Sequence, residues 1–189
     1  MNQEAKKELD RLLKGNENFV NGTPTLENKC LKTLQNQATF QKPKAVVLSC
    51  SDSRVVPEII FDCGIGELFV VRTAGIGVGP NIIESIEFGV QKLNIPLLIL
   101  LGHDDCGVMK YAQEKYPEPL EDFYAIMNSV YPVLGDPNLS SDDIARKHTH
   151  LTKKVLLKRS HIVRQAYEQH KLDIVEAHFN FSTGKVELI

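Results

Sequence analysis

Two apolar runs, each ending at residues able to bind a metal, constrain the fold of this chain most. The first run, residues 45–49 (AVVLS), leads into Cys50, and the second, residues 96–102 (PLLILLG), leads into His103. Short continuous apolar runs of this kind are typical of strands that are buried on both faces, as in a parallel sheet. Ligands of such sheets bind beyond the carboxyl ends of the strands. The two runs therefore predict one crevice that receives reactive side chains from both strand ends.

Strands and helices alternate along the rest of the chain. Further strands are expected at residues 67–71, 172–179 and 185–189. Helices are expected at residues 4–20, 58–61, 80–93 and 140–171, the last behind a capping box of Ser140 and Asp143. Weaker patterns predict a short helix within residues 25–42, where Leu26 is the first apolar position, and two short helices and a loop within 108–139. This alternation predicts an α/β fold with a mainly parallel four-stranded sheet, a short extra edge strand and helices on both faces.

Length and the N-terminal pattern predict how the chain is organised. A chain of 189 residues can bury about 70% of its unfolded surface without disulfides, so we expect a single domain over 1–189. It consists of an N-terminal helical arm (1–40) and an α/β core (43–189). The helix in the arm has an apolar stripe from Leu9 to Phe19 that lacks a partner nearby in the sequence. We therefore expect this helix to project and to pack across the two-fold axis of a homodimer, with a tetramer as the alternative.

Charge and hydropathy argue against several classes of function. The net charge is −2 and there is no basic patch, so nucleic-acid binding is not expected. No apolar run approaches the roughly 20 residues of a membrane span, and residues 1–20 lack the apolar core of a signal peptide. A cytoplasmic, reducing location is expected, in which the four cysteines are thiols or ligands. Cys30 and Cys63 have no candidate partner ligands and are interpreted as structural thiols.

The residues at the strand ends favour a metal site. Catalytic zinc takes three protein ligands from Cys, His and carboxylate and leaves one position for water. Cys50, His103 and Cys106 supply two thiolates and one imidazole, and the H-x-x-C spacing lets one tight turn aim two of them at one ion. In an extended backbone Asp52 and Arg54 share the face of Cys50, which predicts a paired carboxylate and guanidinium beside the metal. The plain alternatives are buried structural cysteines, a hydrogen-bonded histidine and an ordinary ion pair.

A glycine-rich loop offers an interpretation of another class. Gly75, Gly77 and Gly79 follow a predicted strand and precede a predicted helix, as in a dinucleotide-binding turn. The spacing does not fit, because the third glycine of G-x-G-x-x-G would fall on Pro80 or on Ile82. We interpret the glycines as a tight turn that packs closely against a helix. A non-catalytic zinc-binding or redox-sensing module remains a third alternative.

At these residues the chain resembles the β-class carbonic anhydrases. The paired signatures of that family, C-x-D-x-R and H-x-x-C followed by glycine, stand here at residues 50–54 and 103–107. The similarity extends through residues 13–22 and 61–75 to the closing GKVEL, and it is weak over residues 108–140. The resemblance implies an enzyme of the carbonate dehydratase type, a zinc lyase, in an α/β domain that dimerises partly through N-terminal helices.

The resemblance also implies a site and a mechanism. Zinc would be held by Cys50, His103 and Cys106 and would present hydroxide to CO2, giving bicarbonate and a proton. Because two thiolates neutralise the ion, an acceptor that orients the hydroxide becomes more useful, and Asp52, held by Arg54, is the expected acceptor. Asp52 is also the expected fourth ligand in a closed state, which forms when its pairing with Arg54 breaks.

Three positions depart from the family pattern. Ile76 stands where many members have asparagine, Asp104 where threonine is common, and Gly64 where plant-type members carry a glutamine. These departures affect the polarity of the pocket and the path by which the proton leaves the site. They do not change the three expected metal ligands. Some relatives with the same zinc motif hydrolyse carbon disulfide or carbonyl sulfide, which is the alternative within the enzyme class. No proton shuttle is assigned; the other histidines are expected at the surface or in helix packing: His148, His150, His161, His170 and His178.

Overall fold

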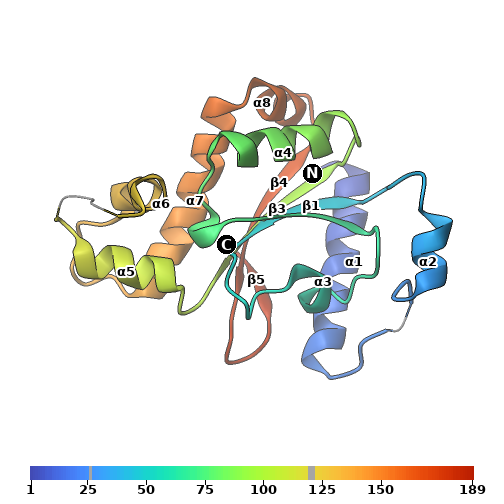
Figure 1. The fold of residues 1–189 in the computed structure, drawn as a ribbon, viewed down its shortest axis with the longest axis horizontal. Coiled ribbons are helices and arrows are strands. Elements are labelled where there is room, and N and C mark those ends of the chain that lie inside the picture. Colours follow the sequence, from blue (N-terminus) through green and yellow to red (C-terminus); the bar gives the residue numbers. More distant parts are fainter. Residues whose placement is uncertain (26, 119–121) are drawn as a thin grey trace.

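A five-stranded sheet with helices on both faces forms the computed structural model, which describes residues 1–25, 27–118 and 122–189 (Figure 1). The strands are β1 (Ala45–Ser49), β2 (Leu68–Arg72), β3 (Leu97–His103), β4 (Asp173–Phe179) and β5 (Val186–Leu188). Their order in the sheet is β2-β1-β3-β4-β5. The first four strands are parallel, and the short β5 pairs antiparallel with β4 at one edge. The expected fold class is confirmed.

The helices fall close to the positions that the sequence predicts. They are α1 (Gln3–Val20), α2 (Leu31–Asn36), α3 (Pro57–Ile60), α4 (Pro80–Gln91), α5 (Gly107–Lys115), α6 (Tyr124–Val130), α7 (Ser141–Arg159) and α8 (His161–Glu168). Two single 3-10 turns lie at Ala74–Ile76 and Tyr131–Val133. The expected capping box of Ser140 and Asp143 begins α7. Leu26 and residues 119–121, which belong to the weaker predicted patterns, lie outside the described residues.

The prediction of one unbroken helix over 140–171 is wrong, because the chain breaks at Ser160. This residue has an extended backbone (φ −102°, ψ 113°) between α7 and α8. Its Oγ accepts a hydrogen bond from the Val163 N–H at 3.0 Å and donates one to Glu87 Oε1 at 2.6 Å. The hydroxyl therefore caps the start of α8, as serine does at many helix starts. The apolar periodicity hides the break, since Leu156 and Val163 are both buried.

Alternate residues of the central strands face the two helical layers. Val46 and Leu48 of β1 belong to a core cluster that includes residues of α4, α5, α7 and α8. Ala45 and Val47 belong to the opposite cluster, with residues of α1 and α3. Figure 1 shows α4, α7 and α8 together on one side, and α5 and α6 at the end of the molecule away from α2. Because both faces of the sheet are covered, its central strands are apolar throughout.

Helix α1 packs on the sheet of its own chain, so the expectation that it projects is wrong. Ala5, Leu9 and Leu12 are at most 6% exposed and contact the cluster formed by β1 and β3. Asn16 adds polar anchoring, because its Oδ1 accepts a hydrogen bond from the Val186 N–H at 2.8 Å. The apolar stripe thus has a partner that is distant in the sequence and adjacent in space. None of the described helices has the apolar length that a membrane crossing requires.

Candidate metal centre

The candidate site lies where the order of strands in the sheet reverses. From β1 the chain continues into β2 on one side, and β3 then joins β1 on the other side. The register pairs Ser49 with Leu101, so Cys50 and His103 emerge at the same edge of the sheet. Cys106 directly precedes α5. The fold therefore brings the three expected ligands together at a switch point, where ligands of open α/β sheets bind.

The geometry of Cys50, His103 and Cys106 suits a metal ion. Their ligand atoms all lie within 4.8 Å of one another, and all three residues are buried. The His103 Nδ1–H donates to the Asp104 carbonyl at 2.7 Å, which leaves the lone pair on Nε2. Within the described part of the chain, this buried Nε2 has no hydrogen-bond partner. An unpaired imidazole nitrogen beside two thiols fits a soft divalent ion such as zinc.

The surroundings of Cys50 favour the thiolate form of its side chain. The hydrogen bond from Cys106 holds the pKa of the Cys50 thiol below its usual value, and the same bond raises the pKa of Cys106. The Cys50 Sγ also accepts hydrogen bonds from the backbone N–H groups of Asp52 and Gly75, each at 3.4 Å. Hydrogen bonds to the charged form of a group favour ionisation. The site is thus prepared to hold thiolate, the form that binds metals.

The glycine-rich loop carries one of these N–H groups to the site. Gly75 has φ +66°, and a Cβ on it would lie 2.7 Å from Val108 Cγ1 in α5. Only glycine meets both demands without strain. Ile76, the next residue, also has a positive φ (52°), and its buried side chain lines a small cavity beside the ligands. The interpretation of this loop as a tight turn packed against a helix is confirmed.

Asp52 and Arg54 form a tight pair beside the three candidate ligands. The Arg54 Nε donates to Asp52 Oδ1 at 2.9 Å, its Nη2 donates to Oδ2 at 2.8 Å, and its backbone N–H donates to Oδ1 at 3.0 Å. These bonds hold the pKa of Asp52 well below its usual range. The predicted extended backbone is wrong here, since β1 ends at Ser49. A turn brings Asp52 and Arg54 together instead. It is closed by a hydrogen bond from the Val55 N–H to the Asp52 carbonyl at 2.9 Å.

Three further residues hold this pair, and the sequence alone did not indicate them. The Arg54 Nη1 contacts Asp105 Oδ2 at 3.2 Å, and its guanidinium lies 4.3 Å from the centre of the Phe181 ring. Arg72 at the end of β2 donates to two carbonyls of the turn, at 3.1 and 2.7 Å. Asp105 directly precedes the candidate ligand Cys106, so its position in the sequence could have indicated a place at the site. Phe181 and Arg72 are distant in the sequence, and only the strand register reveals their place.

The remaining histidines and cysteines divide by burial. His148 is buried in helix packing, as expected, and three others are exposed: His150, His161 and His170. His178 is completely buried in β4 and lies 2.7 Å from Asp104, so of its two expected places the surface is excluded. Cys30 is exposed, and burial raises the pKa of the Cys63 thiol to about 11. Neither cysteine belongs to the metal-type group.

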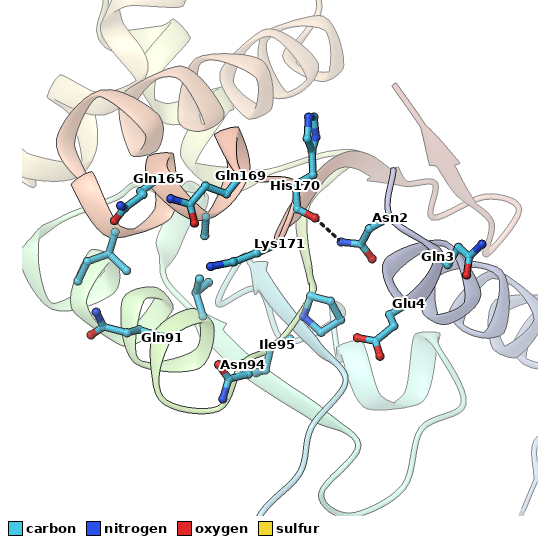
Figure 2. Close-up of a pocket in the computed structure, with 14 residues that line it drawn as sticks. Asn2, Gln3, Glu4, Gln91, Asn94, Ile95, Gln165, Gln169, His170 and Lys171 are labelled. Atoms are coloured by element: carbon cyan, nitrogen blue, oxygen red, sulfur yellow. Dashed lines mark hydrogen bonds between the residues drawn. The ribbon is translucent and has the colours of Figure 1, made fainter.

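A separate cavity of about 540 Å³ lies at the other end of the sheet (Figure 2). Figure 2 shows it between α8, the end of α4 and the start of α1, and the amides of Gln91, Asn94, Gln165 and Gln169 are among the side chains around it. It adjoins Pro96, just before β3 begins, whereas His103 is the last residue of that strand. Seven residues of strand span roughly 20 Å. This cavity is therefore not part of the candidate metal site.

Comparison with known proteins first defines the fold. The chain superimposes on a β-carbonic anhydrase of Sordaria macrospora described as tetrameric, with a TM-score of 0.72 over 82% of this chain and 85% of that one, at 22% identity. A β-carbonic anhydrase of Coccomyxa gives a TM-score of 0.69 over 97% and 82% of the two chains, at 24% identity. These likenesses show that the architecture is that of the β-class enzymes.

Sequence comparison then defines the family. Residues 45–186 match the family model described as carbonic anhydrase. The chain is 36% identical to carbonic anhydrase 2 of Mycobacterium tuberculosis over 184 residues, which cover 94% of this chain and 89% of that protein. It is also 36% identical to a carbonic anhydrase of Mycolicibacterium smegmatis over 181 residues, 92% of this chain and 88% of that one. The chain therefore belongs to the β-class carbonic anhydrases, an enzyme family whose membership implies hydration of CO2.

Proposed function

We propose that this enzyme hydrates carbon dioxide reversibly to bicarbonate and a proton, using one zinc ion held by Cys50, His103 and Cys106. The observation that carries the proposal is the convergence of two buried thiols and an unpaired imidazole nitrogen, all within 4.8 Å of one another among the described residues. Membership of the β-class family supports the same reaction. A set of two cysteines and one histidine is also a known ligand set of catalytic zinc, with the fourth position open.

Zinc supplies, when bound, a Lewis acid that acidifies a water molecule and makes it a nucleophile for CO2. The chain contributes orientation and charge. The bond from His103 to the Asp104 carbonyl fixes the imidazole and leaves Nε2 free to bind the ion, and the N–H of Gly75 supports the Cys50 thiolate. A ligating histidine is commonly oriented in this way by a second hydrogen bond.

Asp52 is the proposed acceptor that orients the proton of the nucleophile. Its low pKa keeps the carboxylate charged at neutral pH, and the pair with Arg54 fixes its position. The cavity beside the ligands is lined by apolar groups, including Ile76, Met109 and Ala145, which suits an uncharged gas and excludes bulk water. We further propose that Arg54 restrains Asp52, which otherwise becomes a fourth ligand and closes the site.

Zinc content measured together with stopped-flow CO2 hydration tests the proposal. The wild type should contain one zinc per chain, and Cys106→Ser and His103→Ala should lose metal and activity together, because a three-ligand site has no spare member. Cys30→Ser, at an exposed thiol outside the site, is the matched control and should keep both. Stoichiometric zinc in both site variants would disprove the assignment of the ligands.

The same measurement separates the alternative functions. Carbonyl sulfide and carbon disulfide resemble CO2 as small linear molecules with an electrophilic carbon, so each should be offered to the zinc-loaded wild type. Turnover of either without CO2 hydration would replace the proposed substrate. Zinc without turnover of any of the three would favour a non-catalytic zinc module.

We propose a homodimer that forms through the outer edge of β2, with a tetramer as a further level of assembly. β2 is the last strand at its end of the sheet, and an unpaired strand edge is a template for pairing with another chain. Exposed apolar side chains occur nearby along the chain, at Ile59 and Ile65. The related structure from Sordaria macrospora is described as tetrameric. The cytoplasm is the proposed compartment, because ligand thiols must stay reduced.

A further inference from the structure

We infer that Asp104, His178 and Phe181 form a clamp that positions both the candidate ligand His103 and its neighbour Arg54. This inference rests on the proposed zinc function and adds positioning residues to it. The three clamp residues come from the turn after β3 and from the end of β4. None of them belongs to the group of candidate ligands among the described residues, so each acts through another residue.

Asp104 is tied to the end of β4 at three points. Its backbone N–H donates to the Phe179 carbonyl at 3.1 Å. Its Oδ1 accepts a hydrogen bond from His178 Nε2 at 2.7 Å, and its Oδ2 accepts one from the Phe181 N–H at 3.0 Å. The carbonyl of Asp104 is thereby held in place to accept the 2.7 Å bond from His103 Nδ1. That bond decides which nitrogen of His103 is free for the metal.

The turn after His103 needs an anchor of this kind. Asp105 has a left-handed backbone (φ 54°), which is uncommon for a residue other than glycine, although aspartate tolerates it better than most. The peptide plane between Asp104 and Asp105 carries the carbonyl that His103 uses. A small rotation of that plane would break the bond and turn the imidazole. The carboxylate of Asp104 opposes this rotation, because it accepts hydrogen bonds from His178 on β4 and from Phe181 just beyond the end of β4.

His178 contributes to the clamp through its Nε2 atom, which bonds to Asp104. It is completely buried, and the bond to Asp104 is the one hydrogen bond that its side chain makes with described residues. Its Nδ1 lacks a partner in the same part of the chain. Leaving a buried polar atom without a hydrogen bond costs free energy. The position of the His178 ring therefore favours the bond from Nε2 to Asp104 at the expense of a partner for Nδ1.

Phe181 extends the clamp to the second half of the site. Its ring centre lies 5.2 Å from that of His103, and the Arg54 guanidinium carbon lies 4.3 Å from it on a cation–π contact. The backbone of Phe181 is fixed by the bond from its N–H to Asp104. One carboxylate therefore fixes the backbone of a residue whose ring contacts both the candidate ligand His103 and Arg54, the partner of Asp52. Asp104, which stands where threonine is common in the resembled family, has in this chain a hydrogen-bond donor in His178.

The test is zinc affinity by chelator competition on the full chain, together with the visible spectrum of the cobalt-substituted protein at full loading. Asp104→Ala should raise the zinc dissociation constant about 10–100-fold, the range typical for loss of a group that orients a ligand. It should also shift the cobalt bands, because the imidazole changes orientation. Asp104→Asn keeps an acceptor for Phe181 and should recover part of the affinity. The control is Asp10→Asn, at an exposed acid on α1.

Wild-type affinity and an unchanged cobalt spectrum in Asp104→Ala would overturn the clamp. If that variant does not fold, the milder His178→Gln and Phe181→Leu carry the test, with the same readouts and smaller expected shifts. Asp104→Ala combined with His178→Gln should bind zinc no more weakly than Asp104→Ala alone, because both act through one bond; additive losses would remove His178 from the clamp. Absence of zinc from the wild type would overturn the proposed function itself, which is a different outcome from normal affinity in the variants.

Discussion

Arg54 shows how much a single side chain decides at this site. Its guanidinium occupies both oxygens of Asp52, contacts Asp105 and lies over the Phe181 ring. In the proposed mechanism this pairing with arginine is what keeps the Asp52 carboxylate from binding the metal. The planar fork of arginine suits this task, because it binds both oxygens at once.

Replacing Arg54 with alanine should free Asp52 to bind the metal. We expect a zinc-loaded protein with CO2 hydration reduced at least about tenfold, the lower end of the effect typical for loss of a group that holds a metal-site residue in place, because the freed carboxylate would take the open position on the metal. Stopped-flow rates and zinc content measure the two effects separately. Arg146→Ala, which removes an exposed pair with Glu187, is the matched control and should stay active. Near wild-type hydration by Arg54→Ala would leave the pair as an ordinary ion bridge.

The burial of His148 predicts that the free energy of unfolding depends on pH. Burial lowers its pKa to about 4, and its ring nitrogens lie 3.1 Å from Thr152 Oγ1 and 3.3 Å from Ser129 Oγ. The unfolded chain takes up a proton near pH 6.5, before the folded chain does, so lowering the pH from 6.5 to 4 favours unfolding. The loss should reach about 3 kcal/mol.

Urea unfolding at pH 7.5 and pH 5 measures this effect. The difference in unfolding free energy between the two pH values should shrink in His148→Gln, because the variant no longer has the titrating group. His161→Gln, at an exposed position, should keep the wild-type difference. An identical pH dependence in wild type and His148→Gln would show that other groups cause the acid sensitivity.

At the scale of elements, the loop between β2 and α4 combines backbone strain with function. Gly75→Ala places a methyl group at a positive φ and within 2.7 Å of Val108. We expect a loss of about 1–3 kcal/mol of unfolding free energy and weaker zinc binding, since the N–H to Cys50 moves. Gly79→Ala is the control, because that position has an ordinary φ of −78° and nothing within 4 Å of the added methyl. Equal losses in both variants would contradict this account.

The elements that the sequence predicted well are those whose signals are local. Continuous apolar runs marked β1 and β3, and the residues that follow them contained all three candidate ligands. The break at Ser160 escaped prediction because its partner, Glu87, lies 73 residues away. The pairing of Asp104 with His178 needs the register of β3 and β4, which places Gly102 opposite His178. Contacts that depend on strand order are invisible to periodicity.

At the scale of the whole molecule, the outer edge of β2 is the proposed dimer interface. Val70→Lys puts a charge on this half-exposed strand and should weaken dimerisation at least about tenfold, because charged side chains block pairing of edge strands. Light scattering across a concentration series measures the change. Leu188→Lys on β5, at the opposite edge, is the control and should remain dimeric. Monomers from Leu188→Lys alone would move the interface to that edge.

The covering of the sheet by α1 has a consequence for the order in which the fold can form. Helix α1 precedes its sheet partners, and the backbone N–H of Asn2 bonds to Asp173 Oδ2 at 2.8 Å, across 171 positions of sequence. During synthesis α1 therefore leaves the ribosome long before β4 exists to receive it. Contacts this far apart must close large loops, which slows folding. We expect the nascent chain to keep an apolar face open until β4 has been made, so that completion of the sheet, and not formation of α1, sets the pace.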